Sequence, residues 1–319
     1  MREISLVNLS RTSWLIAALG ACIASGSATA QSLNGFDLGN ATIPVEHILS
    51  GGPSRDGIPA IENPVFESAS AATWLESEER ILGISLNGIN RAYPIAILNW
   101  HEVVNDIFGD RPIVITYCPL CGTGMAFDSR VDNRNLKFGV SGLLFQSDVL
   151  LYDRQTESLW SQIMSEAISG PQQGMKLDSL ALTHTSWGAW QDDHPNTEVL
   201  SRDTGIRRDY TQDPYAGYAD SPRTLFPVVN RAPGPWYAKE WVLGVEIGGK
   251  YKSYPFAELT KQGLRQFTDE LAGERYTITW DEQNKSAAML RENEIQPSIT
   301  AFWFAWYAFH PGAEVFQGR

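Results

Sequence analysis

The sequence is poor in cysteine and in basic residues. Its 319 residues include three cysteines, and 25 lysines and arginines stand against 37 aspartates and glutamates, a formal net charge of −12. Nucleic acids and anionic membrane surfaces are bound by basic proteins, so this charge balance argues against both as partners. So few cysteines also exclude a small scaffold held together by several disulfides.

Several familiar motifs are missing from the sequence as well. It contains no GxSxG elbow, no Walker loop, no HExxH and no dinucleotide fingerprint. These absences remove the common hydrolase, NTPase, zinc-protease and dehydrogenase interpretations, and no bound nucleotide is expected. The single CxxC pair has no histidine after it, which excludes covalent haem. Whether the protein is an enzyme stays open.

The first 30 residues are typical of a secretory signal peptide. Positive charge near the start is followed by an apolar stretch over residues 14–23 and by the small residues Ala28-Thr29-Ala30. We therefore expect an exported protein, periplasmic or extracellular. An alternative is a lipoprotein, because Leu19-Gly20-Ala21-Cys22 resembles a lipobox, and only lipidated Cys22 would bring the protein to a membrane. The apolar stretch is shorter than the roughly 20 residues that span a bilayer.

Two pairs of segments are similar to each other. Residues 82–98 (LGISLNGINRAYPIAIL) align without a gap with residues 243–259 (LGVEIGGKYKSYPFAEL), and residues 187–199 align with residues 303–315. We therefore expect a strand-rich α+β fold of internally duplicated units, the first of which carries a β insertion. The predicted parts are a signal peptide (1–30), an N-terminal segment (31–78), a first repeat unit (79–200), a connector (201–238) and a second, shorter repeat unit (239–319).

Each unit has the pattern of a strand, a glycine turn and then a helix after Tyr-Pro. In the first unit the helix is predicted over 95–108 and the next strand over 113–117. The insertion, about residues 135–174, has the alternation of short strands joined by polar or glycine turns. The connector is rich in Pro, Tyr, Asp and Arg and has weak periodicity, which is typical of a loop or an ordered lid.

The segment YCPLCGTGMAFD, which contains Cys118 and Cys121, is the sharpest local motif. Two thiolates on a tight turn can bind one metal ion, can form a redox dithiol, or can be joined as a structural disulfide. Two glycines directly after Cys121 disfavour the helix on which a thioredoxin-type dithiol sits. In the second unit a polar turn occupies the same place. We therefore predict that the cysteines lie in a turn between strands.

A two-cysteine turn needs further ligands, and His101 is the strongest candidate. It lies close to the cysteines in sequence, and the second unit has Gln262 at that position. On the predicted helix His101 and Asn105 share one face, beside Glu102. An ordinary amphipathic helix explains the same pattern. Zinc and copper are the metals that thiolates and imidazole suit.

The other polar candidates are weaker. His194 and His310 recur beside paired tryptophans, which favours a packing role. His47 and His184 are expected in polar loops whose surroundings do not indicate a site. Met125 is a doubtful ligand. In the insertion, Arg154 with a carboxylate partner forms either a binding-site clamp or a cross-strand ion pair. The insertion residues with a possible binding role are Asp148, Asp153, Arg154 and Gln162.

Taken together, the segments AYPIAILNWHEVVND, TYCPLCGT, FGVSGLL, DVLLYDRQTESLWSQ and HPNTEVLS resemble an exported bacterial family known as domain of unknown function 3179. The likeness extends from Pro59 to about Leu259. The resemblance implies kinship and no activity. It points to the same residues: Cys118, Cys121, His101, Glu102 and the segment 148–162.

The leading hypothesis is an exported protein that binds copper or zinc through Cys118 and Cys121, with His101 as a third ligand. A second hypothesis is an extracytoplasmic thiol-disulfide oxidoreductase that uses the same two cysteines. A third is a ligand-binding domain in which they form a structural disulfide.

Overall fold

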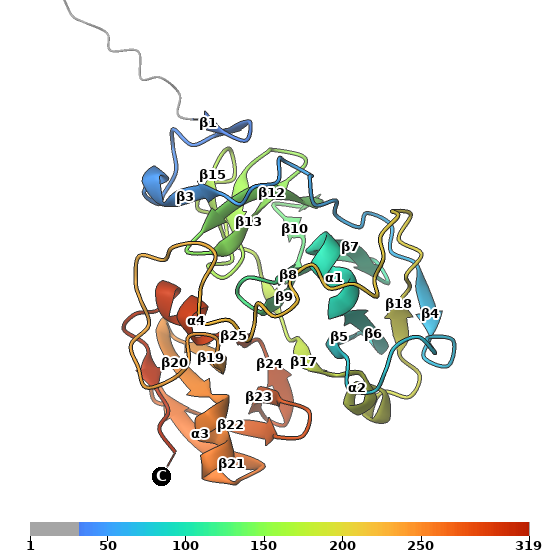
Figure 1. Ribbon diagram of the computed structural model, residues 1–319, viewed down its shortest axis with the longest axis vertical. Helices are drawn as coiled ribbons and strands as arrows, with labels where there is room; N and C mark the ends of the chain where they lie inside the picture. The colour runs from blue at the N-terminus through green and yellow to red at the C-terminus, as the bar shows by residue number, and fades with distance from the viewer. Residues whose placement is uncertain (1–31, 319) are drawn as a thin grey trace, which may run out of the picture. The chain divides into compact units, whose positions relative to one another are not determined.

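Strands dominate the computed structural model, which describes residues 32–318 (Figure 1). Five sheets of four or five strands form the blades of a five-bladed β-propeller. The predicted α+β fold of two duplicated units is therefore wrong. The α-helices of the described range are single short elements of seven residues each: α1 (Ile95–His101), α2 (Trp187–Asp193), α3 (Phe256–Gln262) and α4 (Trp303–Phe309). A 3₁₀ turn, η1, covers Val45–His47.

Three blades come from the N-terminal two-thirds of the chain. The first contains β4 (Phe66–Ser68), β5 (Arg80–Leu86), β6 (Ile89–Pro94), β17 (Thr183–Ser186) and β18 (Glu198–Leu200). The second contains β7 (Val103–Phe108), β8 (Arg111–Cys118), β9 (Thr123–Asp128) and β16 (Ser179–Leu180). The third contains β3 (Ile48–Ser50), β12 (Phe138–Phe145), β13 (Asp148–Asp153), β14 (Leu159–Ser161) and β15 (Glu166–Ser169).

Two blades, drawn in orange and red in Figure 1, come from the C-terminal part. The fourth contains β19 (Trp241–Ile247), β20 (Lys250–Pro255), β25 (Ile299–Phe302) and β26 (Glu314–Val315). The fifth contains β21 (Gln266–Leu271), β22 (Glu274–Asp281), β23 (Ser286–Arg291) and β24 (Glu294–Gln296). Two-stranded ribbons pair β1 (Ser32–Leu33) with β2 (Phe36–Asp37), and β10 (Arg130–Val131) with β11 (Arg134–Asn135).

The predicted signal peptide and Cys22 lie outside the described residues. Within the described range no helix is long and apolar enough to cross a membrane. The predicted connector, 201–238, contains no helix or strand.

The similar sequence segments occupy the first and fourth blades. Leu82 pairs with Tyr93 in one blade and Leu243 pairs with Tyr254 in the other. In both blades a tryptophan packs directly on the glycine that follows this leucine, because a Cβ on Gly83 would lie 2.4 Å from the Trp190 ring, and one on Gly244 would lie 2.1 Å from the Trp306 ring. The two glycines are thus required by close packing.

One hydrogen bond differs between these two blades. The Trp190 indole donates to the Thr197 hydroxyl at 2.9 Å, whereas the buried Trp306 indole has no partner and position 313, which aligns with Thr197, is alanine. Ala313→Thr is expected to supply the missing acceptor and to raise the free energy of unfolding by about 1 kcal/mol. Urea denaturation measures the change. Thr197→Ala should lower stability by a similar amount, and an Ala313→Thr protein that is less stable than the natural one would contradict this account.

The helix predicted over 95–108 is wrong in its second half. Helix α1 ends at His101, and Glu102 takes the left-handed conformation with φ +57° that reverses the chain. The β-branched pair Val103-Val104 then begins β7, which hydrogen-bonds to β8. A strand places successive side chains on opposite faces, so the predicted helical face shared by His101 and Asn105 does not exist.

Two hairpins position the candidate site. The β8–β9 hairpin carries Cys118 and Cys121 at its turn, which confirms the predicted strand-to-strand turn. In the third blade, β12 and β13 are joined by Gln146 and Ser147, both at positive φ, as in a two-residue type I′ turn. The short strands predicted in the insertion are confirmed as β12, β13 and β14.

Candidate metal site

The cysteine turn is tight and closely covered. Cys118 ends β8, and the Cys121 amide donates back to the Cys118 carbonyl at 3.2 Å. Gly122 has φ +64°, and a Cβ there would lie 2.8 Å from the Trp241 ring. Only glycine combines this conformation with this contact. The turn therefore directs both thiols to the same side.

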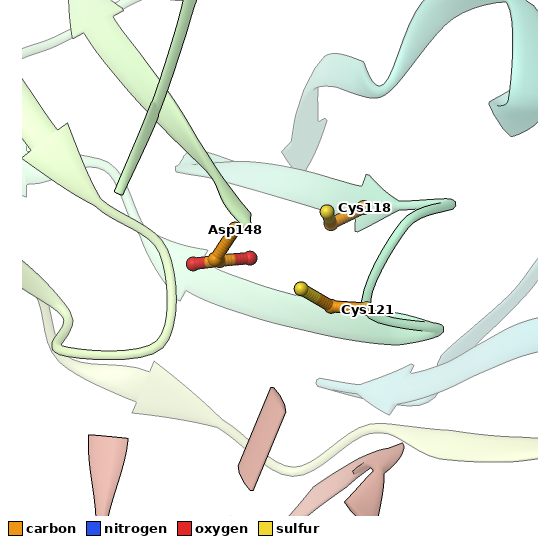
Figure 2. Close-up of side chains that lie close together, drawn as sticks. All are labelled: Cys118, Cys121 and Asp148. Carbon is orange, nitrogen blue, oxygen red and sulfur yellow. The ribbon is translucent and has the colours of Figure 1, made fainter. Parts of the chain in front are cut away.

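Asp148 completes a group of three acidic side chains. It is the first residue of β13, directly after the type I′ turn, and Figure 2 shows its carboxylate facing the two sulfur atoms. One ligand atom from each of Cys118, Cys121 and Asp148 lies within 4.8 Å of the others. The three residues are 1%, 0% and 1% exposed, respectively. The two cysteines belong to the second blade and Asp148 to the third, so the group is created by the tertiary fold.

Unpaired polar atoms gather around this group. Asp148 Oδ2 accepts a 3.1 Å hydrogen bond from the Ile163 amide, but Oδ1 has no partner. Ser147 Oγ and Gln162 Oε1 are also buried without a partner, while Gln162 Nε2 donates to Thr116 Oγ1 at 2.8 Å. Buried polar atoms are normally hydrogen-bonded. The three unpaired oxygen atoms of Ser147, Asp148 and Gln162 are therefore free to accept a hydrogen bond or to serve as ligands.

Burial sets the acidity of all three groups. Desolvation raises the pKa of Cys118, although the hydrogen bond with Cys121 opposes the rise, and raises the pKa of Cys121 further. Desolvation also raises the pKa of Asp148 to about 7, against the hydrogen bond from the Ile163 amide. Without a cation the site is therefore electrically neutral below about pH 7. Both thiols are protonated there, and so is the Asp148 carboxyl in most molecules.

Both described cysteines are free thiols. The Cys121 thiol donates to the Ser147 carbonyl at 3.3 Å, which holds it in the pocket between the two hairpins. A cysteine that attacks disulfides needs a lowered thiol pKa and access for its partner. Cys118 and Cys121 have raised pKa values and are buried, so these features disfavour rapid exchange.

The structure does not bring His101 into this group. Its Nδ1 contacts the Pro59 carbonyl at 2.8 Å and its Nε2 contacts the Tyr210 hydroxyl at 2.7 Å. Among the described residues the close group of potential ligands near the cysteines is Cys118, Cys121 and Asp148. Asn105 bonds the backbone of Phe138 with both ends of its amide, which is a structural role.

The remaining predicted residues lie at the site, in a buried turn or on partly exposed surface. Gln162 lies at the site through its bond to Thr116. Asp153 accepts hydrogen bonds from Trp160 and Thr156, a turn-stabilising arrangement. Arg154 pairs with Asp56 and Glu62 on partly exposed surface, so it does not reach the cysteines.

Three of the other histidines pack against aromatic side chains. The His194 ring lies 4.0 Å from the Trp190 ring and the His310 ring lies 4.2 Å from the Trp306 ring, centre to centre. His184, predicted in a polar loop, is instead buried in β17 against Tyr117 and Trp241. Of the other two side chains considered from the sequence, His47 lies in η1, and Met125 packs in the core that contains both cysteines.

Asp148 was identified from the sequence as a polar residue with a possible binding role, without a link to the cysteines. One signal could have indicated more. It is a carboxylate at the start of DVLLYD, a strand that is otherwise apolar up to its last residue, and such a buried charge needs a partner.

The connector covers the cysteine turn. The Tyr218 hydroxyl donates to the Leu120 carbonyl, between the two cysteines, at 3.1 Å. Lys239 holds this part of the connector, because its ammonium group donates to the carbonyls of Tyr218, Ser221 and Arg223 at 2.6, 2.6 and 2.8 Å. Figure 1 shows the connector as the gold loop that passes β8 and β9.

Lys239→Met is expected to loosen this cover, since the three carbonyls lose their shared donor. The rate at which a thiol reagent labels Cys118 and Cys121 in the folded, metal-free protein should rise by about tenfold or more, because labelling of buried thiols follows local opening. Lys250→Met, at an exposed lysine of β20, is the control and should label at the natural rate. Equal labelling of both variants would show that the connector does not limit access.

The fold and the site thus define a β-propeller with a buried group of two thiols and one carboxyl between two of its hairpins. Residues 55–296, well over half of the chain, match the family described as "Protein of unknown function (DUF3179)", so the chain belongs to that family and the resemblance seen in the sequence is confirmed. No curated protein and no solved structure matches the chain.

Proposed function

We propose that the protein binds one soft or borderline metal ion, zinc or copper, through Cys118, Cys121 and Asp148. The observation that supports it most is the arrangement of these groups: two thiols and a carboxyl are buried within 4.8 Å of one another, and the carboxyl oxygen Oδ1 has no partner. A buried acid without a cation is costly, and a bound metal ion removes that cost.

The donor set favours zinc over copper. Zinc accepts thiolate and carboxylate ligands together, whereas Cu(I) prefers soft sulfur ligands. Three protein ligands leave one position for water or another donor, and the buried oxygens Ser147 Oγ and Gln162 Oε1, which have no other partner, are the candidates for it. When bound, the metal would convert both thiols to thiolates and the carboxyl to carboxylate.

The test is zinc titration of the reduced, purified protein against a chelating indicator, with elemental analysis of the isolated product. We expect one zinc per chain, loss of thiol reactivity on binding, and no stoichiometric zinc in Cys118→Ser. Met125→Leu, in the same core, is the control and should keep its zinc. A natural protein that binds no zinc and no Cu(I), and whose cysteines form a disulfide that glutathione exchanges rapidly, would instead support an oxidoreductase.

We also propose that the protein is exported, on the basis of its first 30 residues. Cell fractionation of the full chain, with mass determination of the product, tests this. A chain that begins after residue 30 is expected in the periplasm or medium, and a lipidated chain that begins at Cys22 would indicate the lipoprotein alternative. A product that retains residues 1–30 in the cytoplasm would refute export.

A further inference from the structure

A cavity of about 300 Å³ lies beside the candidate metal site. It is reached from the surface past Leu225, which is 62% exposed. Leu120 and Val149 line it, and these residues lie next to the cysteines and to Asp148 in the chain. Its volume is at the low end of the range of small-molecule pockets, about 300 to 1,000 Å³. The cavity therefore suits a small ligand.

The lining is apolar apart from one carboxyl group. Glycine, proline, aliphatic and aromatic residues form most of the wall, and Glu102 and Tyr215 supply its polar side chains. Glu102 is 6% exposed. Its carboxyl has one long hydrogen bond of 3.4 Å, from the Tyr215 hydroxyl to Oε1. A buried carboxyl with so little compensation is unusual.

No cation in the described part of the chain pairs with Glu102. Its carboxyl forms no salt bridge, and no lysine, arginine or histidine lines the cavity. The neighbouring His101 is held neutral, because burial lowers its pKa. The nearby Asp148 carboxyl also opposes ionisation of Glu102. The cavity therefore has one acidic group in its wall and no positive charge.

We infer that this cavity binds a small organic cation, a primary alkyl- or arylammonium ion, with its apolar part against the wall and its ammonium group on Glu102. A carboxylate ligand would meet only acids there. A neutral ligand would leave the Glu102 carboxyl with only its long hydrogen bond from Tyr215. A cation provides the missing ion pair in a site that excludes water, where such pairs are strongest.

This inference does not depend on metal binding. A divalent ion with two thiolates and one carboxylate leaves a net charge of −1, so the loaded metal site also favours a cation nearby. In the metal-free protein Glu102 supplies the negative charge once the bound cation has displaced its proton. Failure of one proposal therefore leaves the other in place.

Calorimetric titration with hexylammonium, 1-hexanol and hexanoate tests the inference, because the three probes share a chain and differ in charge. Hexylammonium should bind at least tenfold more tightly than either of the others. Glu102→Gln should remove this preference. Glu258→Gln, at a buried glutamate in α3, is the matched control and should retain it.

Leu225→Trp provides a second variant that does not alter buried charge. A larger side chain at the exposed mouth should weaken hexylammonium binding by about tenfold, and Cys118→Ser should leave it within about twofold. Equal affinity for hexylammonium and 1-hexanol, unchanged affinity in Glu102→Gln, or no binding of hexylammonium at millimolar concentration would each overturn the inference.

Discussion

Asp148→Asn is expected to weaken zinc binding by on the order of 100-fold, and Cys118→Ser or Cys121→Ser to abolish stoichiometric binding. Asparagine keeps the shape of the side chain but removes its charge, so the ion would lose one of three anionic ligands. The metal-free Asp148→Asn protein should be at least as stable as the natural one, because the substitution removes a carboxyl whose ionisation burial opposes. Competition with a chelator of known affinity measures the change.

The same prediction has a pH dependence. Zinc must displace a proton from each thiol and, below about pH 7, from Asp148 as well, because burial raises the pKa of that carboxyl to about 7. Affinity should therefore rise with pH, and the slope should decrease above pH 7 once Asp148 is ionised. Calorimetry in two buffers of different ionisation enthalpy counts the protons released. Asp148→Asn should release about one proton fewer than the natural protein at pH 6.

Asp128→Asn serves as the control. Asp128 is the last residue of β9, and it pairs with Arg111 at the start of β8. The variant should bind zinc as the natural protein does. If Asp148→Asn bound zinc with natural affinity while Cys118→Ser did not, Asp148 would not be a ligand and the ligand set would have to be revised.

The sequence predicted local features of this site better than its assembly. Cys118 and Cys121 stand between two apolar alternating segments, and a turn between strands follows directly from that pattern. The strands of the insertion were equally clear. Neither pattern contains the information that the Gln146-Ser147 turn of another blade faces the cysteines, because that contact depends on how blades pack.

The errors in the fold have identifiable causes. Residues 95–108 carry apolar residues at spacings that suit a helix. Glu102 nevertheless adopts a left-handed conformation, and the β-branched residues Val103 and Val104 after it begin strand β7. His101 is the last residue of α1, and its ring contacts Pro59 and Tyr210. The similar segments led to the prediction of two duplicated α+β units, whereas they are individual blades in a five-bladed arrangement, which sequence similarity alone does not reveal.

Glu102→Gln is expected to change the pH profile of stability in the metal-free protein. Burial raises the pKa of Glu102 to about 8 from an ordinary value of 4.5. The folded state therefore holds this proton more tightly than the unfolded state does. The stability that the proton provides is complete below about pH 4.5 and is lost as the pH rises toward 8, a difference of several kcal/mol for a shift of this size.

Glutamine cannot ionise, so Glu102→Gln should match the natural protein near pH 5 and exceed it in stability near pH 8. Urea denaturation in the presence of a chelator at these pH values measures the difference. Asp148 gives the natural protein a similar slope up to about pH 7, and comparing the two proteins cancels that contribution. Glu258→Gln should behave oppositely, because the hydrogen bond from Lys261 lowers the pKa of Glu258 and its ionised form stabilises the fold. Parallel profiles for natural protein and Glu102→Gln would mean that Glu102 ionises freely in the folded state, and the ion pair proposed in the cavity would then lack its buried, uncompensated acid.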